Sequence, residues 1–331
     1  MVDMSFEQIG LTEQDVVSMY KTMLLARKLD ERMWLLNRAG KIPFVISCQG
    51  QEGAQVGAAY AFDTTKDYVA PYYRDLGIVL HFGMTPKEIM LNAFAKAEDP
   101  NSGGRQMPAH YGQRKNRILT GSSPVATQIP HAVGVALAGR MNQEDFVCLT
   151  SLGEGSTNQG DFHEGLNFAS VHQLPVITMV ENNRFAISVP IEKQLGCTKV
   201  SDRAVAYGMA GVTVDGKNPL EVYAVMKEAV ERARNGGGPS LIEVMTYRLT
   251  AHSSDDDHRQ YRTIEDLQKD KENDPIPYFA NYLVEIGVLN EVKLSEIDDE
   301  VRGIVDQSTE YAENAAYPDA DSLWKHVYVK G

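Results

Sequence analysis

The chain has 331 residues, of which 43% are hydrophobic and 23% charged, a composition that excludes a largely disordered protein. The formal net charge of −13 argues against nucleic-acid binding, which usually requires a basic surface. Three widely spaced cysteines argue against a disulfide framework or zinc site. Without a signal-peptide pattern or an apolar run of roughly 18 residues, we expect a cytoplasmic protein that does not enter a membrane.

The first predicted element is a long helix. Thr12 and Asp15 resemble a capping box ahead of an apolar periodicity from Val16 to Leu36, and Gly40 is suited to the end of the helix. The next stretch, GKIPFVISCQGQEG (residues 40–53), predicts a turn, a short strand and a turn. We therefore expect residues 1–45 to form an N-terminal helical extension.

Two stretches then resemble functional loops. DYVAPYYRDLG (residues 67–77) reads as a loop that leads into a helix, and AEDPNSGGRQMPAHYG (residues 97–112) is too rich in Gly, Pro and Asn for one regular element. Long irregular stretches inside compact domains are usually functional.

Strands and helices alternate from residue 120 onwards. A helix rich in small residues lies in SSPVATQIPHAVGVALAG, and Asn218-Pro219 opens another helix that reaches about Arg234. Buried strands are predicted in FVCLTSL, PVITMV, GVTV and SLIEVMTY, with a helix at residues 161–171 between the first two. This order predicts an α/β fold with a doubly wound, mainly parallel sheet and helices on both faces, over residues 46–262. The acidic remainder, residues 263–331, predicts a C-terminal helical extension.

The segment GEGSTNQGDFHEG (residues 153–165) suggests a phosphate site directly after a strand. A dinucleotide fingerprint fails, because Asn158 stands at the third glycine position and no suitable acid follows about 20 residues later. A P-loop fails as well, since no Gly-Lys-Ser/Thr follows. A metal-bridged diphosphate remains, because Glu154 can bind Mg²⁺ and Mg²⁺ can bind phosphate oxygens.

A second oxygen ligand is expected at the end of a neighbouring strand. PVITMV is followed by Glu181-Asn182-Asn183, and ligands of such sheets bind beyond the carboxyl ends of the strands. Twenty-six residues separate Gly155 from Asn182. This spacing resembles the two-part thiamine-diphosphate motif, Gly-Asp-Gly followed by Asn-Asn, with Glu154 in place of Asp. An unrelated glycine turn and Asn pair is the alternative interpretation.

Further segments extend the resemblance over roughly residues 20–262. PYYRDLG, GGRQMPAHYG, GSSPVATQIPHAVG, ENNRFAISVP and YRLTAHSSDDD are similar to the alpha subunit of the decarboxylating component of branched-chain 2-oxoacid dehydrogenase complexes. Two features favour the branched-chain type. One is Glu154 in the glycine motif. The other is HSSDDD, because pyruvate-specific relatives usually carry a proline after the first acid of this segment. The resemblance implies a thiamine-diphosphate-binding fold and a bacterial-type enzyme.

The resemblance also implies a set of site residues. Mg²⁺ would be bound by Glu154, Asn183 and the backbone carbonyl of Phe185. The cofactor would contact Tyr73, Arg74, Ser123, Val125, Gly153, Gly155, Ser156 and His252. A surface salt bridge to Asp75 is the alternative role for Arg74. Glu181 stands where some branched-chain relatives have a diphosphate-contacting Arg, and we assign it no such role.

Two further roles follow from the same resemblance. Ser122, Pro124, Thr127 and Gln128 match residues that bind a monovalent cation, K⁺, although ordinary helix capping is an alternative for Ser and Thr. His252, in a polar loop after a strand, is the candidate catalytic histidine, ordered by Arg248, Asp256 and Tyr261. His110 is expected near the substrate.

The implied activity is oxidative decarboxylation of branched-chain 2-oxoacids, with reductive acylation of the lipoyl group of a dihydrolipoyl acyltransferase. In the family this activity requires a beta subunit, in an assembly of two alpha and two beta chains. A pyruvate or acetoin dehydrogenase alpha subunit is the nearest alternative. A non-catalytic nucleotide-binding regulator is the alternative from another class, which the missing third glycine disfavours.

Overall fold

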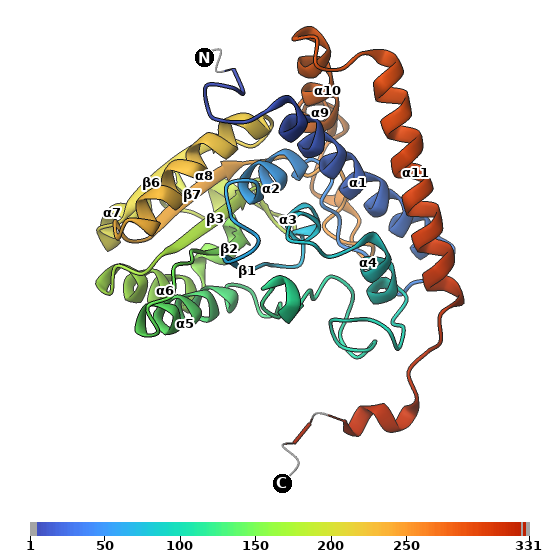
Figure 1. The fold of residues 1–331 in the computed structure, drawn as a ribbon, viewed down its shortest axis with the longest axis horizontal. Coiled ribbons are helices and arrows are strands. Elements are labelled where there is room, and N and C mark those ends of the chain that lie inside the picture. The colour runs from blue at the N-terminus through green and yellow to red at the C-terminus, as the bar shows by residue number, and fades with distance from the viewer. Residues whose placement is uncertain (1–4, 326, 329–331) are drawn as a thin grey trace.

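The computed structural model describes residues 5–325 and 327–328. Within these residues, five parallel strands form the main sheet in the order β1-β2-β3-β7-β6 (Figure 1). Their bounds are β1 (Tyr68–Ala70), β2 (Cys148–Gly153), β3 (Val176–Asn182), β6 (Ala210–Asp215) and β7 (Ser240–Met245). A short antiparallel pair, β4 (Phe185–Ala186) and β5 (Val189–Pro190), follows β3.

Helices precede, connect and follow these strands. They are α1 (Glu13–Arg38), α2 (Glu52–Ala59), α3 (Leu76–His81), α4 (Pro86–Ala93), α5 (Gln128–Met141), α6 (Gly160–Val171), α7 (Ala204–Tyr207), α8 (Pro219–Arg234), α9 (Ile264–Lys271), α10 (Pro275–Glu285) and α11 (Glu291–Asn314). Among the described residues, none of the helices combines the length and the apolar character needed to cross a bilayer.

The sheet separates two hydrophobic cores. Successive side chains of a strand point to opposite faces, so Val176 and Val180 of β3 join the core beneath α5 and α6. Ile177 and Met179 join the core beneath α2, α3 and α8. Figure 1 shows α8 on one side of the sheet and α5 and α6 on the other. Both faces are covered, which explains the continuous apolar strands and confirms the predicted doubly wound α/β fold.

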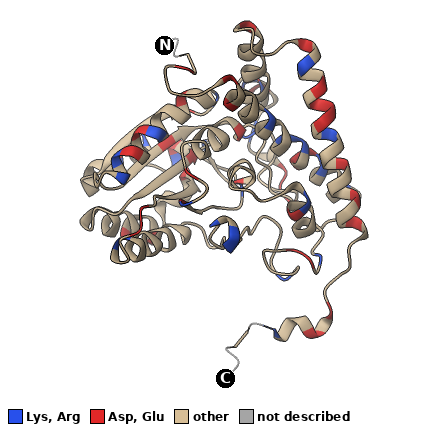
Figure 2. Ribbon diagram, in the orientation of Figure 1, with Lys and Arg blue, Asp and Glu red and all other residues tan. Residues whose placement is uncertain are grey.

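The predicted N-terminal helix is confirmed as α1. Thr12 and Asp15 form the expected capping box, and Gly40 follows the helix with a φ of +71°. Ala26, Leu29 and Met33 of α1 belong to the core beneath α2 and α3. Helix α1 also packs against α11, along which Figure 2 shows many acidic residues.

Two details of the N-terminal half differ from the prediction. The short strand predicted within residues 40–53 is wrong, because this stretch is extended but pairs with no strand. Its hydrogen bonds go to the Asp30 side chain and to Ser254 instead. The edge strand β1 lies where the sequence predicts a loop, because a strand of three residues is too short to show an alternating pattern.

Candidate functional site

A cavity of about 360 Å³ lies beyond the carboxyl ends of β2 and β3, the expected place for a ligand in a parallel α/β sheet. All of the residues expected to hold Mg²⁺ or the cofactor line it: Tyr73, Arg74, Ser123, Val125, Gly153, Glu154, Gly155, Ser156, Asn183, Phe185 and His252. Its remaining lining residues are Tyr72, Ala186 and Ile187. The fold thus gathers into one cavity residues that lie up to about 180 positions apart in the sequence.

Strand register brings the two parts of the motif together. Strands β2 and β3 are parallel neighbours, and Gly153 pairs with Glu181 at their last shared position. Glu154 and Asn183 therefore emerge side by side. The Glu154 carboxylate accepts a hydrogen bond from the Asn183 backbone N–H at 3.3 Å, and Asn183 Oδ1 accepts one from the Phe185 N–H at 3.3 Å.

The turn after β2 depends on a glycine at position 155. A Cβ atom added to Gly155 would lie 2.5 Å from the Ala186 Cβ, closer than real contacts allow. A Cβ added to Gly153 would meet nothing within 4 Å, although Gly153 lines the cavity. Gly155 therefore permits close packing of the two turns, whereas Gly153 leaves space where a ligand can approach the backbone.

Backbone conformations beside the cavity are also unusual. Arg184 and Ile187, on either side of β4, have φ angles of +69° and +55°. Ala126, just before α5, has a φ of +70°. Such left-handed non-glycine residues cost free energy and cluster at functional sites, which supports a functional role for this cavity.

Glu154 is a buried carboxylate without a direct ion-pair partner among the described residues. It is 1% exposed, and among the described residues it forms no ion pair with a Lys, Arg or His side chain. Burial raises the pKa of Glu154. Hydrogen bonds from Gln194 and the Asn183 backbone, together with the positive charge of Arg248, partly oppose this effect. A buried carboxylate that forms no direct ion pair and lies beside an amide oxygen fits a hard cation that prefers oxygen ligands.

The Phe185 side chain points towards two arginines. Its ring centroid lies 5.6 Å from the Arg248 guanidinium carbon and 5.2 Å from that of Arg262. This packing leaves the Phe185 ring engaged elsewhere, so only its backbone carbonyl would serve as a metal ligand.

The opposite wall of the cavity is cationic. Arg74 is 2% exposed, and its Nη1 donates a hydrogen bond to the Ser47 carbonyl at 2.5 Å. Among the described residues Arg74 has no carboxylate partner, so the salt bridge to Asp75 considered from the sequence does not form, and its Nε atom has no hydrogen-bond partner. A buried guanidinium with an unpartnered donor fits an anion such as a diphosphate.

His252 lies next to this arginine. Its Nδ1 atom is 3.5 Å from Arg74 Nη2, and its ring meets the Tyr73 ring edge-on at 6.2 Å. Burial, followed by the positive charges of Arg74 and Arg248, lowers the pKa of His252 to about 4. The imidazole is therefore neutral at physiological pH.

The loop around His252 is fixed by the expected network. Asp256 accepts a hydrogen bond from the His252 backbone N–H at 2.7 Å and another from the Tyr261 hydroxyl. Arg248 in turn donates to the Tyr261 hydroxyl at 2.7 Å. These contacts connect the end of β7 to the loop and hold the imidazole at the cavity.

The residues expected at a monovalent cation site lie just outside the cavity. The Thr127 hydroxyl donates to the Pro124 carbonyl at 2.9 Å, and Gln128 Nε2 donates to the Ser151 carbonyl at 2.6 Å. Ser122 belongs to the same loop before α5, which also carries the cavity residues Ser123 and Val125. These contacts tie the loop before α5 to the end of β2.

Three contributions were missed from the sequence. The Tyr72 hydroxyl donates to the Glu181 carboxylate at 3.2 Å behind the cavity wall, and Gln194 Nε2 donates to Glu154 at 3.3 Å. Ala186 limits the space at Gly155. The sequence carries no signal for these contacts, except that Tyr72 adjoins Tyr73 and Arg74. His110, expected near the substrate, contacts the cavity residue Ser123, with Nε2 2.5 Å from the hydroxyl.

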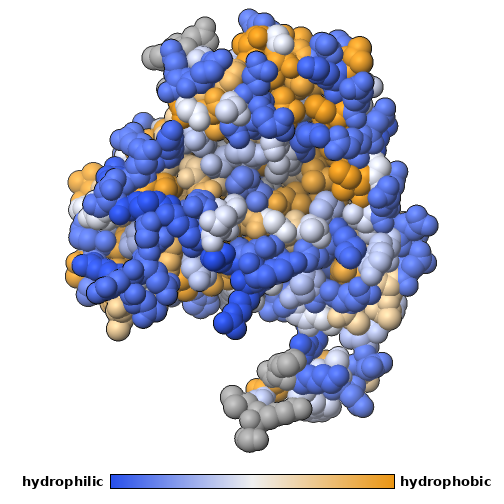
Figure 3. Space-filling view, in the orientation of Figure 1, coloured by the Kyte–Doolittle hydropathy of each residue, from blue (hydrophilic) through white to orange (hydrophobic). Residues whose placement is uncertain are grey.

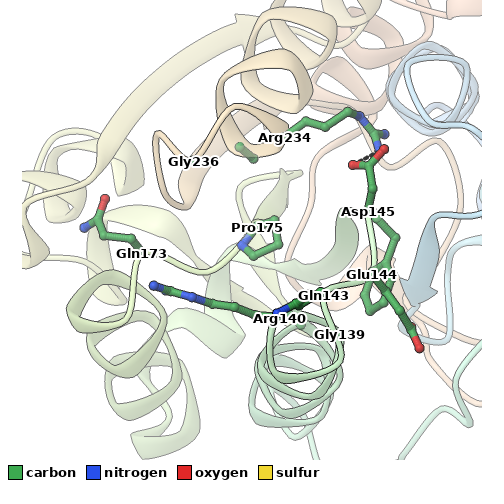
Figure 4. A pocket seen from close by; sticks show the side chains of 12 residues that line it. Gly139, Arg140, Gln143, Glu144, Asp145, Gln173, Pro175, Arg234 and Gly236 are labelled. Carbon is green, nitrogen blue, oxygen red and sulfur yellow. Dashed lines mark hydrogen bonds and ion pairs between the residues drawn. The ribbon is translucent and has the colours of Figure 1, made fainter.

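A second cavity, of about 430 Å³, lies at the opposite edge of the sheet, between the ends of α5 and α8 (Figure 4). Arg234 forms ion pairs there with Asp67 and Asp145 at 2.7 and 3.2 Å. Arg140 donates a hydrogen bond to the His172 carbonyl. Both guanidinium groups thus have partners, and the amino ends of parallel strands are not the usual ligand site, so we assign this cavity no function.

Exposed apolar side chains lie at the ends of α5 and α6 and on the short helix α7. Met141, Val171 and Val205 are 76%, 68% and 82% exposed. Figure 3 shows hydrophobic surface at the left edge of the view, where α6 and α7 lie in Figure 1. Such grouping on an otherwise polar surface is typical of protein–protein contacts.

Comparisons with known proteins agree with this geometry. The family model described as "Dehydrogenase E1 component" matches residues 20–321. The chain is 62% identical over 324 residues to the 2-oxoisovalerate dehydrogenase subunit alpha of Bacillus subtilis, covering 98% of each chain. It is 36% identical to the 3-methyl-2-oxobutanoate dehydrogenase subunit alpha of Mycobacterium tuberculosis, over 97% of this chain and 84% of that one. It is 35% identical to the human mitochondrial 2-oxoisovalerate dehydrogenase subunit alpha, over 97% and 72%.

Proposed function

The chain belongs to the dehydrogenase E1 component family, and we propose that it is the alpha subunit of a branched-chain 2-oxoacid dehydrogenase. It decarboxylates 3-methyl-2-oxobutanoate and related 2-oxoacids with thiamine diphosphate, and transfers the acyl group to a lipoyl group. The observation that carries this proposal is the cavity that joins Glu154 and Asn183 on one side to Arg74 and His252 on the other. The printed names of the similar proteins support the branched-chain substrate.

Magnesium would bind at the ends of β2 and β3. The Glu154 carboxylate, the Asn183 side-chain oxygen and the Phe185 carbonyl would supply protein ligands, with phosphate and water oxygens for the remainder. The support is the buried carboxylate of Glu154, without a direct ion pair among the described residues, beside the Asn183 amide. Glu154 can be the only carboxylate ligand of this site, since proteins typically bind Mg²⁺ through one or two carboxylates.

Arg74 and the cavity backbone would hold the diphosphate. Arg74 supplies a charge-assisted donor, while Tyr73, Ser123, Val125, Gly153, Gly155 and Ser156 line the space around it. Bound thiamine diphosphate supplies an electron sink for decarboxylation. The residues of this chain supply the binding, the orientation and the compensating charge.

His252 would hold and move a proton. Arginine can only donate hydrogen bonds, so the Nδ1 atom that faces Arg74 is the acceptor. The neutral ring then carries its proton on Nε2, where it can be donated to a reacting group and recovered. Because the pKa of His252 is lowered, the imidazole is neutral before the negatively charged ligand binds.

The chain would work with partners. An alpha subunit of this family acts with a beta subunit and a lipoyl-bearing dihydrolipoyl acyltransferase, and we propose an assembly of two alpha and two beta chains. The exposed side chains of Met141, Val171 and Val205, on α5, α6 and α7, support contact with another subunit. In this proposal residues 46–262 form the diphosphate-binding domain, and residues 1–45 and 263–331 form helical extensions. The proposed ligands of K⁺ are Ser122, Pro124, Thr127 and Gln128.

The test is turnover by the alpha–beta assembly. The two chains are co-expressed, and decarboxylation of 3-methyl-2-oxobutanoate, decarboxylation of pyruvate and oxidative cleavage of acetoin are compared with thiamine diphosphate and Mg²⁺ present. The proposal predicts turnover that requires both additions and is fastest with the branched-chain acid. Faster turnover of pyruvate or acetoin would overturn the substrate assignment. Saturable binding of NAD without binding of thiamine diphosphate would overturn the enzyme assignment.

A further inference from the structure

Asp30 lies in the middle of α1, and its carboxylate accepts three hydrogen bonds from one short segment. The Ser47 hydroxyl and Gln49 Nε2 donate to Oδ1, both at 2.8 Å, and the Cys48 backbone N–H donates to Oδ2 at 2.7 Å. The Asp30 side chain is completely buried. A buried carboxylate is costly unless it is hydrogen-bonded, so this concentration of bonds on residues 47–49 requires an explanation.

This segment also contacts Arg74, a side chain of the cavity wall. The Ser47 carbonyl accepts the hydrogen bond from Arg74 Nη1. Among the described residues, the Ser47 carbonyl is the shortest hydrogen-bond contact of the guanidinium, which also lies 3.5 Å from His252 Nδ1 and 5.5 Å from the Tyr73 ring centroid. The position of the Ser47 backbone therefore helps to determine the direction in which the remaining donors of Arg74 point.

The same segment also contacts the loop that carries His252. The Ser254 N–H donates to the Val45 carbonyl at 2.8 Å, and the Leu249 N–H donates to the Gln49 carbonyl at 3.2 Å. The Ser254 hydroxyl accepts a hydrogen bond from the Val45 N–H at 3.2 Å. Residues 45–49 thus lie between α1, the Arg74 side chain and the His252 loop, and we call them the bridging segment.

We propose that Asp30 is a positioning residue for the diphosphate site, which holds the bridging segment so that the Ser47 carbonyl directs Arg74 into the cavity. This inference rests on the proposed function, since it takes Arg74 as a contact of the diphosphate. It assigns α1 a part in cofactor binding, although α1 contributes no residue to the cavity lining.

A carboxylate is required because donors face both of its oxygens. An asparagine at position 30 has one acceptor oxygen and one donor amide group. Its NH₂ group must face either the Cys48 N–H or the side chains that donate to Oδ1. At least one buried donor then loses its acceptor, which usually costs about 1–3 kcal/mol.

The experiment compares Asp30→Asn with a matched control in the alpha–beta assembly. Asp67→Asn is the control, because Asp67 is equally buried and accepts the Val147 and Asp63 backbone N–H groups at 2.8 Å. Asp67 pairs with Arg234 beside the second cavity, at the opposite edge of the sheet. Both variants should lower the melting temperature of the cofactor-free assembly.

Only Asp30→Asn is expected to weaken the site. Its dissociation constant for thiamine diphosphate, measured by calorimetry with excess Mg²⁺, should rise about tenfold, while Asp67→Asn stays within about twofold of the wild type. The kcat of Asp30→Asn at saturating cofactor should change less than the apparent KM for the cofactor. Ser47→Ala keeps the backbone carbonyl but removes a hydroxyl that bonds to Asp30, and should give a smaller rise, about threefold.

Each outcome decides the inference. If Asp30→Asn binds the cofactor like the wild type, or if Asp67→Asn weakens binding equally, Asp30 has only a structural role. If Asp30→Asn does not assemble with the beta subunit, Ser47→Ala decides, and unchanged binding by that variant overturns the inference. The Arg74→Lys variant distinguishes failure of the Asp30 inference from failure of the proposed function. If the wild type binds thiamine diphosphate and Arg74→Lys does not, the proposed function stands whatever the result for Asp30→Asn.

Discussion

The carboxylate of Glu154 accepts a hydrogen bond from the backbone N–H of Asn183 at 3.3 Å. This contact joins the turn after β2 to the turn after β3, at the edge where the parallel sheet is expected to bind its ligand. The buried carboxylate forms no direct ion pair with a cationic side chain of the described residues. The chain alone therefore carries an unfavourable charge that a bound metal would compensate, and this has consequences for both stability and binding.

Glu154→Gln should stabilise the cofactor-free and metal-free assembly near neutral pH. Burial raises the pKa of Glu154 above its ordinary value of 4.5, so the folded state holds this proton more tightly than the unfolded state. The stability that the group contributes below about pH 4.5 is lost as the pH rises through the folded pKa. The melting temperature of Glu154→Gln should exceed that of the wild type at about pH 7, with a smaller difference at lower pH.

Melting curves of both proteins in the presence of a chelator, recorded at several pH values, measure this effect. A wild type that is more stable than Glu154→Gln at neutral pH without metal would show that the carboxylate is already compensated within the protein.

Alanine at the two glycines of the motif should have different effects. Gly155→Ala places a Cβ 2.5 Å from the Ala186 Cβ, so the turn must shift, and we expect a loss of stability of about 1–3 kcal/mol. Gly153→Ala meets no protein atom within 4 Å but adds a methyl group at the cavity wall. It should fold with normal stability and bind thiamine diphosphate more weakly. Equal melting temperatures for the two variants would contradict the packing that we describe.

His252 should make the cofactor-free assembly sensitive to acid. Its pKa is lowered from 6.5 to about 4, so between these values the unfolded state binds a proton that the folded state does not. Stability that is present above about pH 6.5 is therefore lost as the pH falls towards about 4. The difference in melting temperature between the wild type and His252→Gln should decrease from about pH 7 to about pH 5.

Other titrating groups, such as His81, whose pKa is also lowered to about 4, are common to both proteins and cancel in this comparison. A difference that stays constant over the same pH range would show that His252 is accessible to protons in the folded state.

Much of the architecture could be predicted because its signals are local. The apolar runs of β2, β3 and β7 are continuous because helices cover both faces of the sheet. Capping residues marked the starts of α1 and α8, at Thr12 and Asn218. The pairing of Glu154 with Asn183 followed from the rule that parallel strands end at the same edge.

The remaining features depend on contacts between distant segments. Residues 40–53 contain strand-forming residues, but their backbone bonds to Asp30 and Ser254 rather than to a neighbouring strand. Nothing near Asp30 in the sequence indicates that its carboxylate reaches residues 47–49. Arg74 and His252 are 178 positions apart, and only the resemblance to a known family placed them at one site before the fold was described.

The most direct test of the account is calorimetric titration of thiamine diphosphate into the alpha–beta assembly, with Mg²⁺ and with a chelator, for the wild type and Glu154→Gln. The account predicts that the wild type binds the cofactor when Mg²⁺ is present. When the chelator removes Mg²⁺, its affinity for the cofactor should fall about 10- to 100-fold. Glu154→Gln should bind as weakly with Mg²⁺ as the wild type does without it. Wild-type affinity in Glu154→Gln, with the same dependence on Mg²⁺, would contradict the assignment of Glu154 as the residue that holds the metal.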